Sequence, residues 1–513
     1  MSDFYLLGCD VGTSGTKSVL FTLSGKPVAS SVYEYPLYQP QNGYAEQDPR
    51  DFAEAAFASI RDVIAKSGVS PDSVLSVGLS GQMHGLVLLD EKGEPLRRAI
   101  IWCDQRTGEE CEEITRILGR EKLIAITANP AVTGFTASKI RWVQKHEPEI
   151  YEKTRKILLP KDYVRFALTG EFATDYSDAS GMQLMDVPNR RWSNEVCAAL
   201  GIDLSLLAPL CESSETAGRI SREASKKTGL LPGTPVAGSA GDQAAAAVGS
   251  GIVRPGVISA TIGTSGVVFA YADRPSIDPQ GRVHTLCHAV KGAWHVMGVT
   301  QGAGLSLQWF RNRFCGEEMR VAAGLGVDPY SILDREAALS PIGADGLLFL
   351  PYFMGERTPH LDPDARGVFF GLTASHEKRD LLRAVMEGVG HSLTDCYDII
   401  RELGFDAREV RAAGGGGRSP FWRQMLSDMF SAPVVTTNSS EAGALGAALL
   451  GGVAAGVYKD VPEACDVTVF TGNTVRPDPA AAAYYRKAHV LYQKLYRSLR
   501  EDYQLLKELR NPV

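Results

Sequence analysis

Residues 5–21 read YLLGCDVGTSGTKSVLF, in which two apolar runs flank the turn Gly12–Gly15. Residues 256–270 read GVISATIGTSGVVFA and repeat the same Gly-Thr-Ser-Gly turn between apolar runs. Each stretch predicts a β-hairpin, because apolar runs favour strands and a glycine-bounded turn of small residues joins them. A tip that offers backbone N–H groups and a hydroxyl suits a phosphate.

The repeated tetrapeptide is a weak indication by itself, since 52 of the 513 residues are glycine. Its context is stronger, because both copies follow an apolar run and each stands near the start of one half of the chain. The two hairpins therefore predict a duplicated fold that holds one polyphosphate from both sides.

Length and composition predict two domains of the α/β class with a cleft between them. A chain of 513 residues is too long for one ordinary core, and 44% of its residues are hydrophobic. We place the boundary at Arg254-Pro255-Gly256, which gives domains 1–253 and 254–513, because strands followed by helices recur in each half. The net charge of −7 disfavours nucleic acid as a partner.

Cysteine usage and the N-terminus predict a cytoplasmic protein. The nine cysteines include no C-x-x-C pair, which is typical of free thiols in a reducing compartment. The N-terminus has no secretion signal. The uncharged tract 442–458 is rich in glycine, so it predicts a closely packed helix rather than a membrane span.

Hydrophobic periodicity predicts the remaining elements. We expect helices at 51–66, from Asp242 onward and at 421–430, with a mostly helical region at 107–230. Expected strands lie at 74–80, 86–90, 99–102, 235–240, 283–290, 293–299, 346–352 and 367–372.

Two common nucleotide motifs are missing, since the chain has no G-x-x-x-x-G-K-[ST] and no G-x-G-x-x-G between a strand and a helix. Phosphate binding by the hairpins is the remaining interpretation. Asp10 would repel a phosphate unless a divalent cation lay between them, so it is a candidate Mg²⁺ partner through water, or else a turn-forming Asp. Lys17 is either a phosphate contact or an exposed strand lysine.

Asp242 stands at a strand-to-helix junction among small residues, in Gly238-Ser239-Ala240-Gly241-Asp242-Gln243. One interpretation is a helix N-cap. The other is a general base on the floor of a cleft, with the helix N-terminus favouring the ionised carboxylate.

Two further segments are candidates for ligand binding. The loop Gly81-Gln82-Met83-His84-Gly85 links two expected strands, and Trp102 ends the next one, where α/β folds bind ligands. The loop Gly414–Gly417, which precedes the helix at 421, lets a base or phosphate lie against the backbone. His284 and His288 would lie roughly 13 Å apart in a strand, too far to share a zinc ion. The loop 355–363 either lines the cleft or braces the domains.

Together these motifs resemble the FGGY family of carbohydrate kinases over about residues 4–455. The resemblance implies two actin-like, ribonuclease-H-like domains with ATP in the cleft. Within the family, Gln82-Met83-His84-Gly85 is similar to members that act on xylulose, whereas members that act on glycerol carry an Arg-Glu pair there.

The resemblance also implies roles for single residues. Asp242 matches the catalytic base, and Asp10 and Thr13 match the first phosphate hairpin. The implied sugar contacts are Gln82, Met83, His84, Trp102, Asp242 and Gln243. The implied ATP contacts are Thr13, Ser14, Gly15, Lys17, Gly263, Thr264, Gly304, Gln308, Gly415, Gly416 and Ser419. Ser419 and Gln243 depart from the Asn found at these positions in other members.

The expected reaction is therefore transfer of the γ-phosphate of ATP to the C5 hydroxyl of D-xylulose, with Asp242 as the base. Another ketopentose or polyol is the alternative substrate. A conformational ATPase like actin or Hsp70 is the alternative class, although no appended substrate-binding domain is expected after residue 457. The remaining partner expectations are no membrane and a homodimer.

Overall fold

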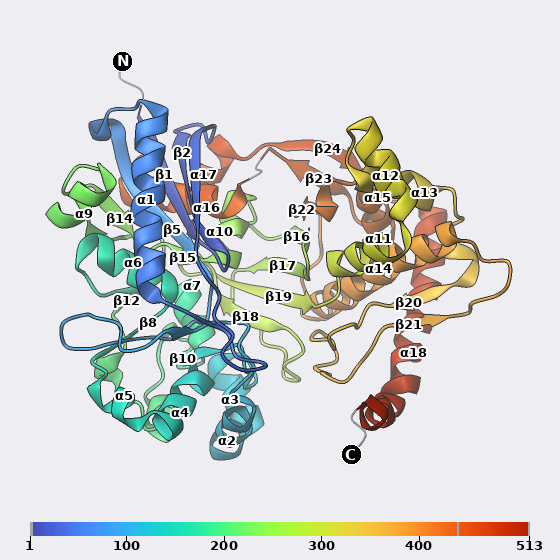
Figure 1. The fold of residues 1–513 in the computed structure, drawn as a ribbon, viewed down its shortest axis with the longest axis horizontal. Helices are drawn as coiled ribbons and strands as arrows, with labels where there is room; N and C mark the ends of the chain where they lie inside the picture. Colours follow the sequence, from blue (N-terminus) through green and yellow to red (C-terminus); the bar gives the residue numbers. More distant parts are fainter. Residues whose placement is uncertain (1–3, 439–440, 511–513) are drawn as a thin grey trace.

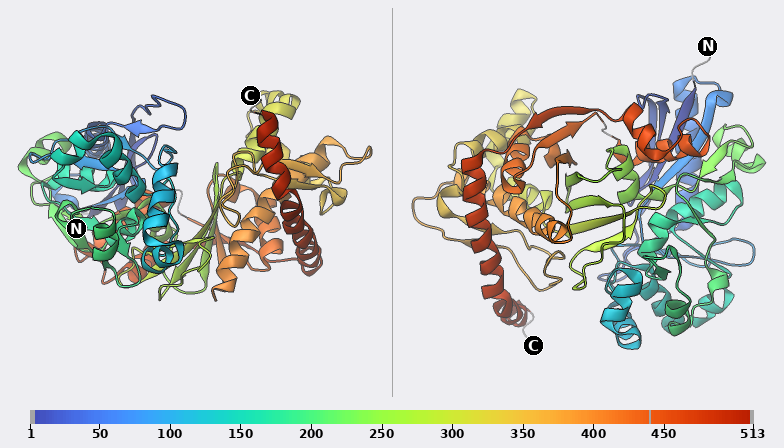
Figure 2. Two further views of the ribbon diagram at one scale, coloured as in Figure 1. Left: turned by 90° about the horizontal axis from the view of Figure 1, so that it is seen from below. Right: turned by 180° about the vertical axis from the view of Figure 1, so that it is seen from behind.

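The computed structural model describes residues 4–438 and 441–510. These residues form two lobes, each built on a large mixed β-sheet with helices packed against it (Figures 1 and 2). The predicted α/β class with two related domains is confirmed. Residues 1–3, which entered the expectation about secretion, lie outside the described part of the chain.

The first sheet has the N-terminal hairpin near its centre. Its strands follow the order β13-β14-β5-β1-β2-β3, with β15 beside β5. β1 is antiparallel to β2 and parallel to β5, and β2 is antiparallel to β3. The bounds are β1 Tyr5–Val11, β2 Gly15–Thr22, β3 Pro27–Glu34, β5 Val74–Gly81, β13 Thr216–Arg219, β14 Pro235–Ala237 and β15 Ala240–Gly241.

The second sheet repeats this pairing pattern around the second hairpin. Its order is β18-β19-β17-β16-β22-β23-β24. β16 is antiparallel to β17 and parallel to β22, and β17 is antiparallel to β19. The bounds are β16 Val257–Ile262, β17 Gly266–Ala272, β18 His284–Cys287, β19 Trp294–Thr300, β22 Glu409–Ala413, β23 Val434–Thr437 and β24 Thr471–Val475.

Two predicted strands of the first half do not join its main sheet. The stretch 86–90 forms β6, which pairs with β8, and 99–102 forms β7, which pairs with β4. The short strands outside the main sheets are β4 Glu46–Gln47, β6 Val87–Leu89, β7 Ala99–Ile100, β8 Lys156–Leu158, β9 Thr174–Asp175, β10 Met185–Asp186, β11 Arg191–Trp192, β12 Leu210–Cys211, β20 Leu348–Leu350 and β21 Val368–Phe370.

Helix α1 shows how local signals set an element and bury its face. Asp48 caps the helix by accepting a hydrogen bond from the Arg50 N–H, Pro49 begins it, and Gly68 ends it in the left-handed region (φ 65°). The apolar stripe that includes Phe52 and Ile60 is fully buried beside the first sheet.

The α-helices complete the two lobes. Their bounds are α1 Pro49–Ser67, α2 Gly108–Leu118, α3 Arg120–Thr127, α4 Thr136–His146, α5 Pro148–Lys153, α6 Pro160–Thr169, α7 Tyr176–Ala179, α8 Asn194–Ala199, α9 Arg222–Thr228, α10 Asp242–Gly249, α11 Gly304–Phe314, α12 Gly316–Leu325, α13 Pro329–Ala338, α14 Lys378–Glu402, α15 Pro420–Phe430, α16 Ala442–Ala454, α17 Val461–Thr468 and α18 Pro479–Arg510.

Helix α16 lies far along the chain but packs on the first sheet, beside β1, β5 and α10 (Figure 1). The packing is backbone to backbone. A Cβ on Gly446 would stand 1.8 Å from the carbonyl oxygen of Ala245, and a Cβ on Gly78 would stand 1.7 Å from that of Ala447. The tract 442–458 thus contains the closely packed helix that its glycines predict. Among the described residues, no helix is both long and apolar enough to cross a bilayer.

Replacing Gly446 by alanine is expected to lower the Tm, because the added methyl group would meet the backbone of α10. Overpacking of this kind costs about 1–3 kcal/mol. Gly324→Ala in α12 is the matched control, since a Cβ there meets nothing within 4 Å and helix propensity favours alanine. Thermal unfolding followed by circular dichroism measures both variants. Equal Tm values would contradict the close packing.

Candidate functional site

Three strand ends meet at one edge of the first sheet. Val11 of β1 lies beside Gly81 of β5, and Gly241 of β15 lies on the other side of Gly81. Because the strands are parallel, the segments that follow them emerge together. These segments are the first hairpin tip, the loop that begins at Gln82, and the helix that begins at Asp242.

Asp10 and Asp242 form an acidic pair at this edge. Asp10 Oδ1 is buried and accepts no hydrogen bond from the described residues. Burial raises the pKa of Asp10, and the neighbouring Ser80 hydroxyl opposes the rise. Burial, together with the charge of Asp10, raises the pKa of Asp242 to about 7.

This raised pKa corrects one sequence expectation. The helix N-terminus was expected to favour the ionised form of Asp242, but burial beside a second carboxylate outweighs it. The capping interpretation also fails, because Gly241 is the N-cap and no side chain caps the first turn. The Asp242 carboxyl is therefore not committed to capping its own helix.

The loop after β5 lies beside Asp242 through Met83. The Met83 side chain is buried and approaches Gly241, where an added Cβ would stand 2.8 Å from Met83 Cγ. His84 adopts a positive φ of 67°, and its Nδ1 lies 2.9 Å from the carbonyl oxygen of Gly181. Burial and nearby cations hold the pKa of His84 well below its ordinary value, so the ring is neutral at pH 7.

Two of the residues expected to contact the sugar also form hydrogen bonds within or beside the first hairpin. Gln82 is buried and donates to the carbonyl oxygen of Gly12 (3.3 Å) and to Gln47 Oε1 (2.9 Å). Trp102 Nε1 donates to Thr13 Oγ1 (2.9 Å), while the indole is partly exposed. Gln243 follows Asp242 at the start of α10, and its hydrogen bonds oppose the rise in the pKa of Asp242.

The other hairpin residues differ in their surroundings. Ser14 is exposed, and Gly15 lies so close to β3 that a Cβ would stand 2.5 Å from the carbonyl oxygen of Tyr33. Lys17 Nζ forms an ion pair of 2.7 Å with Glu441 at the start of α16. Lys17 thus links the first sheet to the later half of the chain.

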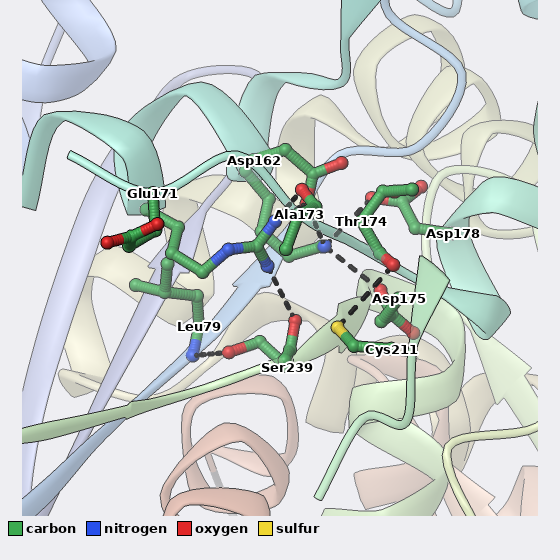
Figure 3. A network of polar contacts seen from close by, with 12 residues as sticks. Leu79, Asp162, Glu171, Ala173, Thr174, Asp175, Asp178, Cys211 and Ser239 are labelled. Atoms are coloured by element: carbon green, nitrogen blue, oxygen red, sulfur yellow. Dashed lines mark hydrogen bonds and ion pairs between the residues drawn. The ribbon is translucent and has the colours of Figure 1, made fainter. Parts of the chain in front are cut away.

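A buried cluster of charges lies behind the strand ends (Figure 3). Lys161 Nζ is 2.7 Å from Asp162, 2.9 Å from Asp175 and 3.5 Å from Asp178. Arg165 Nη2 lies 2.8 Å from Asp162 as well. Breaking a buried pair of this kind leaves an uncompensated charge, so the cluster fixes α6 and α7 relative to one another.

The cluster also reaches the residue before Asp242. Ser177 Oγ donates to Asp175 (2.6 Å) and accepts from the N–H of Gly241 (3.2 Å). Ser239 Oγ accepts from the N–H of Leu79 (2.7 Å), which ties the segment before Asp242 to β5 (Figure 3). The position of Asp242 therefore depends on hydrogen bonds from its own segment to β5 and to the segment that carries Asp175 and Ser177.

A pocket of about 470 Å³ opens in the second lobe. It brings together seven residues that the sequence analysis assigned to ATP: Gly263, Thr264, Gly304, Gln308, Gly415, Gly416 and Ser419. The remaining lining residues were not identified from the sequence, and they include Leu305, Tyr330, Ser331, Asp334, Arg418 and Trp422. The start signal Asp328-Pro329 predicts a helix there, but no local pattern shows that it faces the glycine loop.

The second hairpin is joined to this pocket through backbone bonds. The N–H of Gly304 donates to the carbonyl oxygen of Gly263 (2.8 Å), and that of Leu305 donates to Thr264 (3.1 Å). A Cβ on Gly304 would stand 2.4 Å from Gly263 O, so only glycine permits this approach. Ser419 Oγ accepts from the N–H of Trp422 (3.0 Å), so it caps α15 at the pocket rim.

Comparison with known families identifies the chain. The model of the N-terminal domain of the FGGY family of carbohydrate kinases matches residues 5–249, and that of its C-terminal domain matches residues 258–455. The chain belongs to the FGGY family of carbohydrate kinases. It is a sugar kinase, with ATP as the phosphoryl donor.

Proteins named xylulose kinase and gluconokinase are among its relatives. The xylulose kinase of Bacillus subtilis (strain 168) is 37% identical over 506 residues, covering 99% of each chain. The gluconokinase of Bacillus licheniformis is 34% identical and covers 97% of each chain. The crystal structure of a ligand-bound xylulose kinase from Lactobacillus acidophilus has a TM-score of 0.91 at 29% identity, covering 98% of this chain and 99% of that one.

Proposed function

We propose that this sugar kinase phosphorylates the C5 hydroxyl of D-xylulose. Full-length relatives named xylulose kinase support this substrate, as does the loop Gln82-Met83-His84 beside the strand ends. The observation that carries the proposal is the position of Asp242, which is the first residue of α10 and directly follows Gly241, against which Met83 packs.

In the proposed mechanism Asp242 is the general base. Its carboxylate accepts the proton of the C5 hydroxyl while that oxygen bonds to the γ-phosphorus of ATP. The bond from the γ-phosphorus to the bridging oxygen breaks, and ADP leaves with that electron pair. A pKa of about 7 suits this role, because roughly half of the base is ionised at pH 7 and it binds the transferred proton more tightly than an ordinary carboxylate does.

The second-lobe pocket is the proposed site of the adenosine group. The exposed backbone of Gly415 and Gly416 offers a flat face, and Gln308, Ser331 and Asp334 offer polar side chains. The N–H groups of both hairpins, with Thr13, Ser14, Gly15, Thr264 and Lys17, are the proposed phosphate contacts. Contact with a phosphate would require Lys17 to turn away from Glu441.

Mg²⁺ fits beside Asp10. Its Oδ1 is a buried oxygen without a partner among the described residues, and magnesium is commonly held by one or two carboxylates, waters and phosphate oxygens. The described residues contain no cluster of three or more acidic, histidine or cysteine ligands, so waters and ATP would complete the shell. Bound there, the ion would offset the negative charge of the phosphates.

A panel of acceptors tests the substrate. ADP release is measured with D-xylulose, L-xylulose, D-ribulose, gluconate and glycerol. D-Xylulose should have the highest kcat/KM, by about tenfold or more over the other acceptors. A higher value for gluconate would overturn the assignment in favour of the activity named for the Bacillus licheniformis relative. Equal ADP release without any sugar would favour a conformational ATPase.

Asp242→Asn should lower kcat by about 10²–10⁴-fold, because the amide cannot accept the hydroxyl proton. ATP binding measured by calorimetry should be unchanged, since the proposed adenosine pocket lies in the other lobe. Asp72→Asn, at an exposed acid on the surface, is the control and should keep full activity. A fully active Asp242 variant would remove the residue from the mechanism.

The pH profile reports the same carboxyl. Because the base must be ionised and its pKa is raised to about 7, kcat/KM should fall about tenfold per pH unit below neutrality. A solvated carboxyl, with a pKa of about 4, would leave the profile flat down to pH 5. Steady-state kinetics from pH 5 to 8 distinguish the two cases.

A further inference from the structure

The loop Gly355–Pro363 lies between β20 and β21 and is anchored on both sides of Arg357. Glu356 is buried and accepts hydrogen bonds from Thr300 Oγ1 (2.6 Å), Ser392 Oγ (3.1 Å) and the N–H of Gln301 (2.9 Å). Thr358 donates its N–H to the carbonyl oxygen of Val299 (3.0 Å). The backbone of Arg357 is therefore held in a fixed position beside the end of β19.

The Arg357 side chain reaches the first lobe. Its Nη2 is 3.9 Å from the position that a Cβ would occupy on Gly134. Gly134 precedes Phe135, whose ring centroid lies 4.5 Å from that of His84 and 5.5 Å from that of His284. After burial, which is the main cause, the charge of Arg357 also contributes to the lowered pKa values of His84 and His284.

The guanidinium has hydrogen-bond donors to spare. Among the described residues, none accepts a hydrogen bond from the Arg357 side chain or forms an ion pair with it within 4 Å. Other poorly exposed arginines behave differently, since Arg106 pairs with Asp104, Arg165 with Asp162 and Arg383 with Glu387. A guanidinium carries five N–H donors and stays charged, and the half-buried side chain of Arg357 leaves these donors open to water or to a ligand.

The neighbouring cation is already engaged. Lys139 Nζ is buried and donates to the carbonyl oxygens of His84 (3.3 Å), Phe135 (3.3 Å) and Gly134. Burial lowers the pKa of Lys139 to about 7. Beside Gly134 and Phe135, Arg357 is thus the cation whose N–H donors have no acceptor among the described residues. A ligand rich in oxygen atoms could accept hydrogen bonds from them.

We propose that Arg357 of the second lobe is a sugar-binding residue, which acts together with the loop Gln82-Met83-His84 of the first lobe. The side chain of Met83 packs against Gly241, the residue before Asp242, and its far end lies near Gly181, which the His84 ring also approaches. Met83 therefore lies between Asp242 and His84. Since C5 of the sugar lies at Asp242, Arg357 donates to the oxygens at the opposite end of the ketose, the C2 carbonyl and its neighbouring hydroxyl. This assignment rests on the proposed function.

The test compares Arg357→Ala with Arg366→Ala, a control in the same connection whose guanidinium contacts only backbone carbonyls. The KM for D-xylulose should rise about 10- to 100-fold in Arg357→Ala, as expected for loss of hydrogen bonds to a charged group. The KM for ATP and the Tm should stay at the values of the unmodified protein. Arg366→Ala should leave all three unchanged.

Two added measurements keep the outcome decisive. Methylguanidinium added to Arg357→Ala should recover part of the lost kcat/KM, and Arg357→Lys should give an intermediate KM because it keeps the charge but not the fork. An unchanged sugar KM, or a lower Tm without a change in KM, would reduce Arg357 to a brace between the lobes.

A wrong substrate assignment can be distinguished from a wrong role for Arg357. Turnover of D-xylulose by the unmodified protein tests the substrate. If another acceptor is preferred, the ratio of KM values between variant and unmodified protein is measured with that acceptor. A ratio near one would then overturn the role of Arg357 alone.

Discussion

The register of three parallel strands is the constraint on which the site depends. Val11, Gly81 and Gly241 lie side by side, so β1, β5 and β15 finish at one edge. Glycine at two of these ends lets large side chains approach the backbone. A Cβ on Gly81 would meet Lys161, and one on Gly241 would meet Met83. Segments from three distant parts of the chain therefore emerge together at one edge of the sheet.

Burial then separates the acids of this region into two groups. Asp162 and Asp175 lie against Lys161 and Arg165, so their charges are compensated. Burial instead raises the pKa values of Asp10 and Asp242, and the charge of Asp10 adds to the rise at Asp242. The paired acids hold the backbone in place, and the unpaired ones retain the capacity to bind a cation or a proton.

Local patterns in the sequence were enough to predict much of the framework. The two hairpins, α1 and the small-faced helix α16 follow from turn residues, caps and spacing. The seven predicted residues of the second-lobe pocket came from motifs recognised through the family resemblance, and they line one cavity.

What could not be predicted depends on contacts between distant segments. The pKa of Asp242 is set by its burial beside Asp10, and the amide of Gln82 is taken up by the hairpin backbone. Trp102 follows β7, which pairs with β4 and not with the main sheet. Its hydrogen bond to Thr13 therefore could not be read from the order of the strands. Arg357 lies far from Gly134 in sequence, and no periodicity in a loop reports which lobe its side chain reaches.

The position of α16 bears on how the chain is made. This helix covers β1 and β5, yet it is synthesised after almost the whole second lobe. During translation the first sheet must therefore wait, with one apolar face uncovered, until residues 442–454 leave the ribosome. The first lobe is continuous in space but not along the chain, so a fragment that ends at residue 253 would lack part of its own core.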